Sequence, residues 1–474
     1  MKKTIHTFLE SYTCKSNEKK LLLKLKKMRE SIQFDVSRIK FSDMEKWSKQ
    51  KDTGDLVHES GKFFSIKCGR AQDIDTGKTR FQPIIDQPEQ GILGIISRYA
   101  KGRLEILLQM KVEPGNVDVV QLSPTVQATK SNYTRVHKGS SIPYLWEFKE
   151  NHDGLTNIVS KAFQSEHGYK FYKKANDNMH VHNNDTEIID DRFEWFTLSD
   201  IRTLLSNPCC INMDTRSVLA TMDFIGETLK ASDIDFDKFG TMTSLEKDLI
   251  ISSVSDESAL WKMSEIKTWI TNHKKNKRIT QKLLPLKKLP KDWKKTSASI
   301  SNSKIKDFEV IAIKSSIDSR EVSSWCQPIV KDNAPKVYAF ILKKINNIFH
   351  VYIQAIEEDF SWDGPELGPS ITQYDNDKDG WIPELEKEMT VIYDSYQPEE
   401  GGRFMQQKNR YMMFINDDNS GFELETFQQG TGVWMTLHQL KRMCKFPCVV
   451  NIEARTLLTI ASYYSEGAFL RKKK

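Results

Sequence analysis

The sequence predicts a protein of the α+β class in which one mixed-sheet domain with flanking helices occurs twice. Two observations support this prediction. In each half of the 474-residue chain, segments with strand-like alternation come first and a helical pattern follows. Motifs of the first half also return in the second half in the same order, which indicates an internal duplication. A chain of this length is too long for one ordinary core, so two domains agree with both observations.

The N-terminal part of the chain has a helical pattern. Apolar residues between Phe8 and Met28 fall at helical spacing, and lysines occupy the opposite face. We therefore expect residues 1–45 to form a helical segment. From Gly61 onward the pattern changes to strands, as at 91–97.

The internal repeat keeps one register over a long stretch. The tripeptide Gln-Pro-Ile at 82–84 returns at 327–329, which is 245 positions later. Further matches follow at separations of 239 and 233 positions, so shared elements are joined by loops of different length. Three of these matches pair Glu113 with Glu358, Glu166 with Glu399, and Trp195 with Trp434.

The duplication sets the expected domain boundaries. We place the first copy at 46–240, a helical linker at 241–290 and the second copy at 291–474. In each copy a helix should follow a threonine that is suited to cap it, Thr197 or Thr436. Gln439 completes a capping-box pattern in the second copy.

Composition excludes several classes of protein. Hydrophobic residues make up 38% of the chain, no apolar run is long enough to span a bilayer, and the N-terminus does not have the pattern of a signal peptide. A soluble, cytoplasmic protein is expected. The net charge of +6 is modest, and its basic clusters lie mostly near the termini and mid-chain, so neither a nucleic-acid nor a membrane partner is predicted.

Cysteine usage points to free thiols. The seven cysteines are odd in number and scattered, which argues against a disulfide framework. Cys444 and Cys448 have the spacing of half a zinc site, but no second Cys/His pair accompanies them. We expect buried thiols and no bound metal.

The stretch at 121–139, QLSPTVQATKSNYTRVHKG, is the strongest candidate for a binding segment. It follows the alternating segment 104–110 and concentrates hydrogen-bond donors, cations and one imidazole within nineteen residues. Such a set of groups at the exit from a strand suits an anionic polar ligand. A solvated loop is the alternative that composition alone leaves open.

Together with 82–109 and 113–116, this stretch resembles the signature of the NDP-hexose 2,3-dehydratases, and the resemblance runs over about residues 40–465. It implies tandem Nudix-like domains, a homodimer and no cofactor. The absence of a GxGxxG fingerprint agrees with a reaction that needs no redox cofactor. A 3-ketoreductase or an aminotransferase would act on the product.

The resemblance also implies the chemistry. Water is removed across carbons 2 and 3 of a dTDP-4-keto-6-deoxyhexose. The ketone at carbon 4 acidifies the proton on carbon 3, so a base can remove it and leave an enolate. Loss of the 2-hydroxyl requires an acid, and the enol that forms tautomerises to a 3,4-diketo-2,6-dideoxy sugar.

A Nudix hydrolase is an alternative that the residues disfavour. The segments that correspond to the magnesium-binding Nudix helix are 161–169 and 394–402. Most of the glutamates of that motif are absent from the first segment, and the second contains serine and proline. A hard dication needs several oxygen ligands, so magnesium-dependent hydrolysis is not expected. A non-catalytic sugar-nucleotide-binding protein is the other alternative.

The resemblance assigns roles in the first copy. His137 is the favoured acid or base because of its intrinsic pKa, with Tyr133 and Glu147 as rivals. Arg135 suits the pyrophosphate or the developing enolate. The remaining residues of the stretch that we expect to bind substrate are Lys130, Ser131, Asn132, Thr134 and Lys138.

Binding is expected to use both copies. Trp47 and Trp293 precede the first strand of each copy and either stack on thymine or pack in the core. The second copy lacks the arginine and histidine of the signature, so we expect one catalytic pocket in the first copy and a binding, bridging or vestigial pocket in the second. Its candidate binding residues are Ser370, Ile371, Thr372, Asp375, Asn376, Arg403, Lys408, Asn409, Arg410 and Tyr411.

Overall fold

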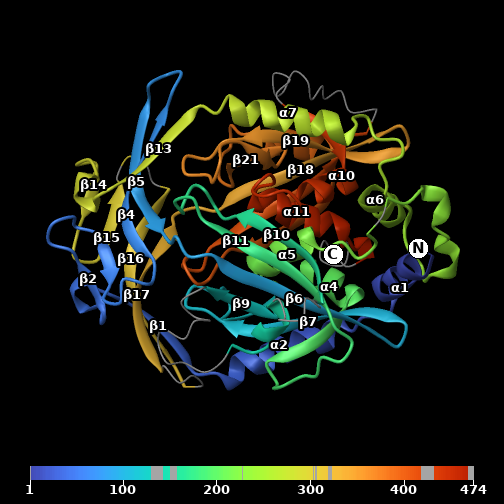
Figure 1. Cartoon of the computed structure of the whole chain (residues 1–474), viewed down its shortest axis with the longest axis horizontal. Coiled ribbons are helices and arrows are strands. Elements are labelled where there is room, and N and C mark those ends of the chain that lie inside the picture. The colour runs from blue at the N-terminus through green and yellow to red at the C-terminus, as the bar shows by residue number, and fades with distance from the viewer. Residues whose placement is uncertain are drawn as a thin grey trace.

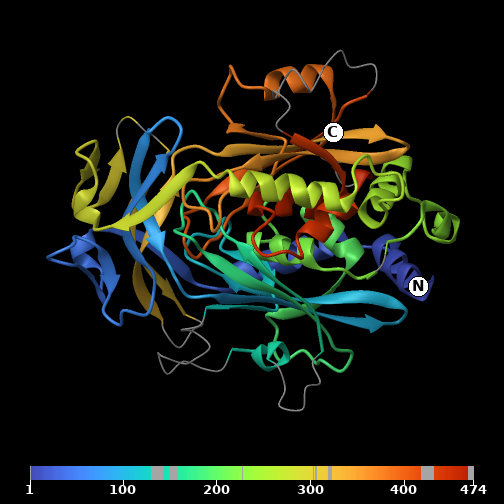
Figure 2. The same cartoon turned by 45° about the horizontal axis from the view of Figure 1, so that its top comes forward.

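The computed structural model describes residues 2–129, 142–149, 157–226, 228–302, 304, 307–318, 323–417 and 432–467. The chain has the predicted α+β character, with two five-stranded sheets and two seven-stranded sheets. The small sheets lie together at one end of the molecule, on the left of Figure 1. The large sheets occupy the other end and enclose a layer of helices between them (Figure 2).

The first large sheet is built from the first half of the chain. Its central order is β10-β11-β6-β7-β12, and β6 and β11 run parallel while the other neighbours are antiparallel. β8 and β9 pair with β7 and β6. The strands are β6 (Gly91–Ala100), β7 (Arg103–Val112), β8 (Val120–Pro124), β9 (Val126–Thr129), β10 (Ile158–Ser165), β11 (Ala175–His182) and β12 (Phe193–Thr197).

The second large sheet repeats this topology. β18 and β23 form its parallel pair, and the central order is β20-β19-β18-β23-β22, with β21 and β24 beside β18 and β19. The strands are β18 (Lys336–Ile345), β19 (Ile348–Ile356), β20 (Glu366–Gly368), β21 (Ile371–Tyr374), β22 (Thr390–Pro398), β23 (Lys408–Ile415) and β24 (Gly432–Thr436).

The two small sheets exchange strands between the halves of the chain. β1 (Phe34–Ile39) pairs with β16 of the second half, and β13 (Ile279–Leu284) pairs with β4 of the first half. Neither small sheet therefore comes from one half alone. The other strands are β2 (Trp47–Lys49), β3 (Leu56–His58), β4 (Ser65–Asp73), β5 (Thr79–Asp86), β14 (Trp293–Lys295), β15 (Ser299–Asn302), β16 (Phe308–Ile317) and β17 (Ser324–Asp332).

The helices also follow the duplication. Thr197 and Thr436 cap the helices after β12 and β24, and each forms the capping box. The α-helices are α1 (Lys2–Thr13), α2 (Glu18–Ser31), α4 (Leu198–Leu205), α5 (Met213–Thr221), α6 (Ser244–Val254), α7 (Met263–Lys275), α8 (Ile382–Glu388), α10 (Leu437–Met443) and α11 (Ile452–Ser462). The 3-10 turns are η1 (Phe41–Asp43), η2 (Leu145–Phe148), η3 (Ala231–Asp233), η4 (Phe236–Lys238) and η5 (Leu286–Lys288).

The core lies between the inner faces of the large sheets and the helices. Ile106 and Val351, from β7 and β19, join Leu457 of α11 in this core. The outer faces are covered differently, by η2 on the first sheet, where Phe148 packs, and by α8 on the second sheet, where Leu385 packs.

Residues 1–45 and 241–290 contain the helices α1, α2, α6 and α7. They also contain the strands β1 and β13, which the helical pattern did not predict, because each strand completes a small sheet of the other half. The segments compared with the Nudix helix lie largely on strands. Residues 161–165 lie on β10 and 394–398 lie on β22, paired along their length with neighbouring strands.

The described part of the chain contains no helix long and apolar enough to cross a membrane. All seven cysteines are free thiols, and six of them are buried.

Candidate functional site

Buried charged side chains gather where two turns of the chain meet. We call these turns, residues 166–174 after β10 and 399–407 after β22, the seam turns. Each one bonds through its backbone to the other copy: the Gly115 amide donates to the Gly401 carbonyl at 2.7 Å, and the Phe360 amide donates to the Gly168 carbonyl at 2.9 Å. These two bonds are equivalent under the duplication. They deliver side chains of each copy into a polar site of the other.

Site 1 is the group formed by Glu113, Glu166, Asp214, Glu400 and Arg403. The first three belong to the first copy: Glu113 follows β7, Glu166 follows β10, and Asp214 lies in the first turn of α5. The other two come from the seam turn of the second copy. Glu166 and Asp214 are buried, with 6% and 3% of their surface exposed.

Burial raises the pKa values of three acids of site 1, Glu166, Asp214 and Glu400. Burial raises the pKa of Asp214 well above its usual range, and Glu166, Glu400 and Glu113 raise it further by repulsion. Burial likewise raises the pKa of Glu400 to about 7, against the pull of Arg403. Carboxyls packed this closely cannot all ionise together, so the site can both hold and accept a proton.

Two of these carboxylates border the same space. A side-chain carbon placed on Gly402 would lie 3.3 Å from Oε1 of Glu400 and 3.4 Å from Oε1 of Glu113. Because Gly402 has no side chain, this space remains open between the two carboxylates. Lys111 Nζ lies 3.1 Å from Glu113 Oε1 and supplies a cation beside them.

Arg403 is fixed in place by the first copy. Its Nε donates to Gln87 Oε1 at 3.1 Å, and its guanidinium lies 4.1 Å from the centre of the Phe64 ring. A half-buried guanidinium held in this way can bind a diphosphate or stabilise a developing enolate.

Part of the signature stretch lies at the rim of site 1. Gln127 on β9 donates to Glu113 at 3.2 Å and accepts from Asn212 at 3.2 Å, and Thr129 pairs with Gly91 where β9 ends. The predicted residues that follow lie outside the described residues, namely Lys130, Ser131, Asn132, Tyr133, Thr134, Arg135, His137 and Lys138.

Glu147 lies away from site 1. It is part of η2, which covers the outer face of the first large sheet, and its carboxylate accepts hydrogen bonds of 3.0 and 3.1 Å from Asn183 Nδ2. Site 1 lies on the inner face of the same sheet, where Gln127 accepts a hydrogen bond from Asn212, the N-cap residue of α5. The structure therefore does not bring Glu147 together with Glu113 or Glu400.

Site 2 is the equivalent group in the second copy. It consists of Glu358, Glu399 and Glu453, together with His167 and Lys170 from the first copy's seam turn. His167 bonds to Glu399 through Nε2 at 3.1 Å and to Glu453 through Nδ1 at 2.9 Å. An imidazole thus occupies the place that Glu400 has in site 1.

The pKa values in site 2 follow from the replacement of a carboxyl by the His167 imidazole. Burial lowers the pKa of His167, but the bonds to Glu399 and Glu453 outweigh burial and raise it well above the usual value. Burial would raise the pKa of Glu399, yet His167 lowers it below the usual range. Burial and the nearby Glu453 raise the pKa of Glu358 to about 8.

The two tryptophans are buried side chains with different surroundings. Trp47 is 9% exposed and packs against Phe64, with ring centres 4.9 Å apart. Trp293 is 4% exposed, and its indole donates to the Phe81 carbonyl at 2.8 Å. Trp293 also lines a cavity of about 420 Å³ between the small sheets, together with Lys78, Thr79, Arg80, Phe81, Gln82, Tyr169, Pro290, Asp292, Asn302 and Asp307.

This cavity lies next to the second large sheet. Tyr169 and Tyr374 both donate to the Asp307 carboxylate, the latter at 2.5 Å. The Lys336 ammonium lies 4.4 Å from the centre of the Tyr169 ring. A cavity of this volume with cations and aromatic rings in or beside its wall has the features of a ligand site.

The candidate residues on β21 and after it are spread over different environments. Ser370 is fully buried and donates to the Tyr352 carbonyl at 2.5 Å, and Ile371 belongs to the core under α8. Thr372 and Asn376 are exposed. Asp375 accepts from Tyr396 and lies 3.6 Å from Arg410.

The candidate residues on and before β23 divide between the two sites and a separate ion pair. Asn409 and Tyr411 donate to Glu399 at 2.7 and 2.9 Å and therefore belong to site 2. Arg403 belongs to site 1. Arg410 pairs instead with Asp394 at 2.8 Å, and the exposed Lys408 lies over the Tyr396 ring.

Sequence reasoning did not assign a role to the acids of site 1 or to His167. The sequence did contain a signal for these residues, because acidic residues recur at equivalent positions of the two copies: Glu113 with Glu358, Glu166 with Glu399, and Asp214 with Glu453.

Among the residues that the structure describes, no group of His, Cys, Asp and Glu is arranged to hold a metal ion.

Comparisons with known proteins agree with the duplication. A protein-family model described as NDP-hexose 2,3-dehydratase matches residues 18–222 and 263–461. The matched segments begin 245 positions apart and end 239 positions apart, the separations of the repeat.

Curated relatives match nearly the whole chain. A dTDP-4-dehydro-6-deoxy-alpha-D-glucopyranose 2,3-dehydratase from Saccharopolyspora spinosa is 35% identical over 454 residues, covering 92% of this chain and 89% of the relative. A protein of the same name from Streptomyces violaceoruber is 34% identical over 90% of this chain and 92% of its own length. Another from Amycolatopsis orientalis is 32% identical over 91% of this chain and 87% of its own length.

Proposed function

Because the chain belongs to the NDP-hexose 2,3-dehydratase family, we propose that it removes water from a dTDP-4-keto-6-deoxyhexose. A base takes the proton from carbon 3, and the electron pair is delocalised into the ketone at carbon 4. The bond from carbon 2 to its hydroxyl then breaks as an acid protonates the departing oxygen. The enol tautomerises by gaining a proton at carbon 2, so the products are a 3,4-diketo-2,6-dideoxy sugar nucleotide and one water.

The observation that carries this proposal is the cluster of acids in site 1, three of which have pKa values raised by burial. The reaction needs one group that takes a proton and another that gives one, at neutral pH. We assign proton donation to Glu400, whose pKa of about 7 keeps a large fraction protonated. Glu113, which faces the same space, is the base. His137 and Tyr133 of the signature stretch are the rival assignments.

Substrate binding in this proposal uses cations of both copies. Arg403 of the second copy and Lys111 of the first lie beside the two acids and suit the pyrophosphate or the enolate. Trp293 lines the cavity between the small sheets, and we assign it to contact the nucleotide base. The second copy would then serve both as a partner in site 1 and as a separate binding pocket.

The proposal extends to the properties that go with the family. We include in it a homodimer, a cytoplasmic location, a dTDP-linked substrate, no cofactor, and a 3-ketoreductase or aminotransferase that consumes the product. We also include Nudix-like ancestry of the duplicated unit, which the parallel pair in each mixed sheet supports. The domain boundaries are best moved to include the exchanged strands, so that the copies begin before β1 and before β13.

Mass spectrometry of the sugar nucleotide in deuterium oxide tests the function. The full chain is incubated with dTDP-4-keto-6-deoxyglucose without added metal or nicotinamide. Loss of one water together with deuterium at carbon 2 is the expected result. Unchanged substrate despite measurable dTDP binding would favour a non-catalytic binding protein, and release of dTMP would favour a hydrolase.

A further inference from the structure

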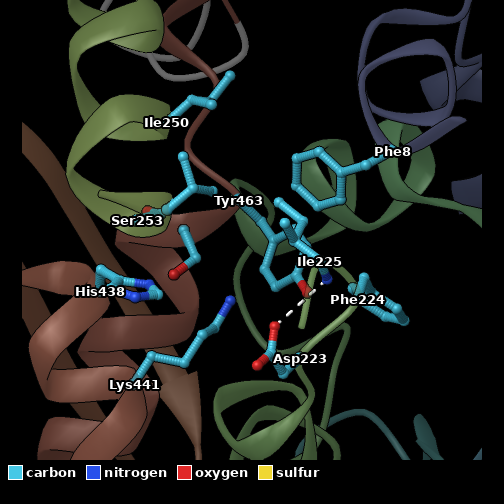
Figure 3. A pocket seen from close by; sticks show the side chains of 11 residues that line it. Phe8, Asp223, Phe224, Ile225, Ile250, Ser253, His438, Lys441 and Tyr463 are labelled. Carbon is cyan, nitrogen blue, oxygen red and sulfur yellow. Dashed lines mark hydrogen bonds between the residues drawn. The ribbon is translucent and has the colours of Figure 1, made fainter. Parts of the chain in front are cut away.

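A small cavity lies where helices of the second half meet the N-terminal helix. Its volume is about 20 Å³, and its walls come from α1, α6, α10, α11 and the segment after α5 (Figure 3). None of its lining residues belongs to site 1 or site 2. Much of the wall is apolar and consists of Phe8, Phe224, Ile225, Ile250 and Val254.

Three hydrogen-bond donors line this apolar cavity. Tyr463 and Ser462 are 1% and 5% exposed, and their hydroxyls have no hydrogen-bond partner among the described residues. The ammonium of Lys441 reaches into the cavity from α10, and in Figure 3 it and the ring of Tyr463 approach from opposite walls. In the part of the chain that the structure describes, Lys441 has no carboxylate within 4.0 Å of its ammonium. Buried donors in proteins are normally paired, so the hydroxyls of Tyr463 and Ser462, with the half-buried Lys441 beside them, call for an acceptor.

Among the residues that the structure describes, the one carboxylate in the cavity wall, that of Asp223, is already engaged. The Asp223 carboxylate accepts from Lys445 at 2.7 Å and from the Gly226 amide at 2.8 Å. Burial would raise the pKa of Asp223, but these bonds lower it to about 2. Lys441 and Lys445 therefore share one carboxylate. Burial lowers the pKa of Lys441 and Asp223 opposes this shift, so a further anion beside Lys441 would favour its charged form.

The remaining titratable group adds no charge at neutral pH. Burial lowers the pKa of His438 below its usual value, against the pull of Asp256. Its Nε2 shares a hydrogen with Thr228 Oγ1 at 3.0 Å. Asp256 is itself paired with Arg442 at 3.1 Å, so it does not neutralise Lys441.

We propose that this cavity binds one chloride ion, held by the ammonium of Lys441 and the hydroxyls of Tyr463 and Ser462. A volume of about 20 Å³ admits one particle of roughly the size of a water molecule and excludes a tetrahedral oxyanion such as phosphate. A water would accept from the ammonium but leave its charge uncompensated, whereas a halide takes all three donors and neutralises the charge. The ion connects α10 with the C-terminal end of α11.

A bromide soak tests the site directly. Crystals of the full chain are transferred into sodium bromide, and an anomalous difference map is calculated at the bromine edge. A peak between Lys441, Tyr463 and Ser462 is expected. Density for water without an anomalous signal at that position would overturn the proposal.

Thermal unfolding gives a second, independent reading. Mass action predicts a higher midpoint in potassium chloride than in potassium gluconate at equal ionic strength, by about 1–2 °C for a chain of this size. Lys441→Met should abolish this chloride-specific increment. Lys267→Met, which removes an exposed ammonium lying 4.4 Å from the Phe446 ring centre, is the matched control and should keep it.

An equal chloride response in wild type and Lys441→Met would contradict the assigned ligand. If Lys441→Met does not fold, Tyr463→Phe provides a milder change, because it removes one donor and keeps the ring. The expected result is then a reduced increment and a weaker bromide peak.

Discussion

Glu400 and His167 occupy equivalent positions in the duplication, 233 residues apart, yet one gives its site a carboxyl and the other an imidazole. His167 is fully satisfied by Glu399 and Glu453. Glu400 is surrounded by other acids and has a pKa of about 7. This one difference leaves a carboxyl with a raised pKa in site 1 and an imidazole paired with two carboxylates in site 2, and it is why the proposal puts proton transfer in site 1.

The role of Glu400 can be tested by removing only its proton. Glu400→Gln should lower kcat about a hundred-fold or more with little change in KM, because it deletes the acid and keeps the shape. In wild type the protonated form is lost as pH rises through about 7, so kcat should fall there.

In Glu400→Gln the fall of kcat near pH 7 should be absent. Glu388→Gln, the same change at an exposed position of α8, is the matched control and should behave as wild type. An unchanged kcat and pH profile in Glu400→Gln would remove it from the mechanism. Inactive wild type would instead contradict the proposed function itself.

His167 should make stability depend on pH. Its folded pKa is raised, so its stabilisation is complete below the ordinary value of about 6.5 and is lost as pH rises through the folded pKa. His167→Gln should lower the free energy of unfolding by about 3–5 kcal/mol at pH 6, because it leaves two buried carboxylates without their partner. The deficit should be smaller at pH 9, as measured by urea unfolding.

His180 offers a matched control of opposite sign. It is 3% exposed, and burial lowers its pKa to about 3. A lowered imidazole pKa means that stability is lost as pH falls below about 6.5, so the deficit of His180→Gln should grow with pH. Parallel pH trends in the two variants would show that His167 is not held as an ion pair.

At the scale of elements, the two capping threonines form the helix caps that the local sequence predicts. Thr436 is fully buried and its hydroxyl accepts from the Gln439 amide at 3.1 Å. Thr436→Ala should lower the free energy of unfolding by about 1 kcal/mol, since an amide of α10 loses its acceptor. Chemical denaturation measures the change.

An exposed threonine inside a helix is the control for this substitution. Thr268 lies within α7, and its hydroxyl donates to the Ser264 carbonyl one turn earlier. Thr268→Ala should therefore change stability by less than about 0.5 kcal/mol. Equal effects at both positions would mean that the cap contributes nothing of its own.

At the scale of the whole molecule, the two halves are interlocked. β1 and β13 each complete a sheet of the other half, and two fully buried arginines cross between the copies. Arg216 donates to the Pro398 carbonyl at 2.6 Å, and Arg455 donates to the Ser165 carbonyl at 2.5 Å. Each arginine thereby satisfies the end of a strand in the opposite copy.

This interlocking predicts that neither half folds alone. Residues 1–240 and 241–474, expressed separately, should each lack a cooperative unfolding transition, because each would expose an unpaired sheet edge and buried charge. Coexpression of the halves should give a stable complex that co-purifies and unfolds in one transition. A sharp transition for 1–240 alone would contradict the interlocking.

The sequence by itself determined the α+β class, the recurrence of motifs, the two helix caps and membership of the family. These features are local or periodic, so patterns and spacing report them. The sequence did not predict the strands β1 and β13. Their partner strands lie in the other half of the chain, and a local pattern does not reveal a distant sheet edge.

Only the tertiary structure decided which charges meet. Glu166 and His167 are neighbours in sequence but enter different sites, as do Glu399 and Glu400. The two seam turns pack so that Glu166 and Glu400 enter site 1, while His167 and Glu399 enter site 2. Burial then shifts their pKa values, and burial is a property of the assembled fold that no residue pattern encodes.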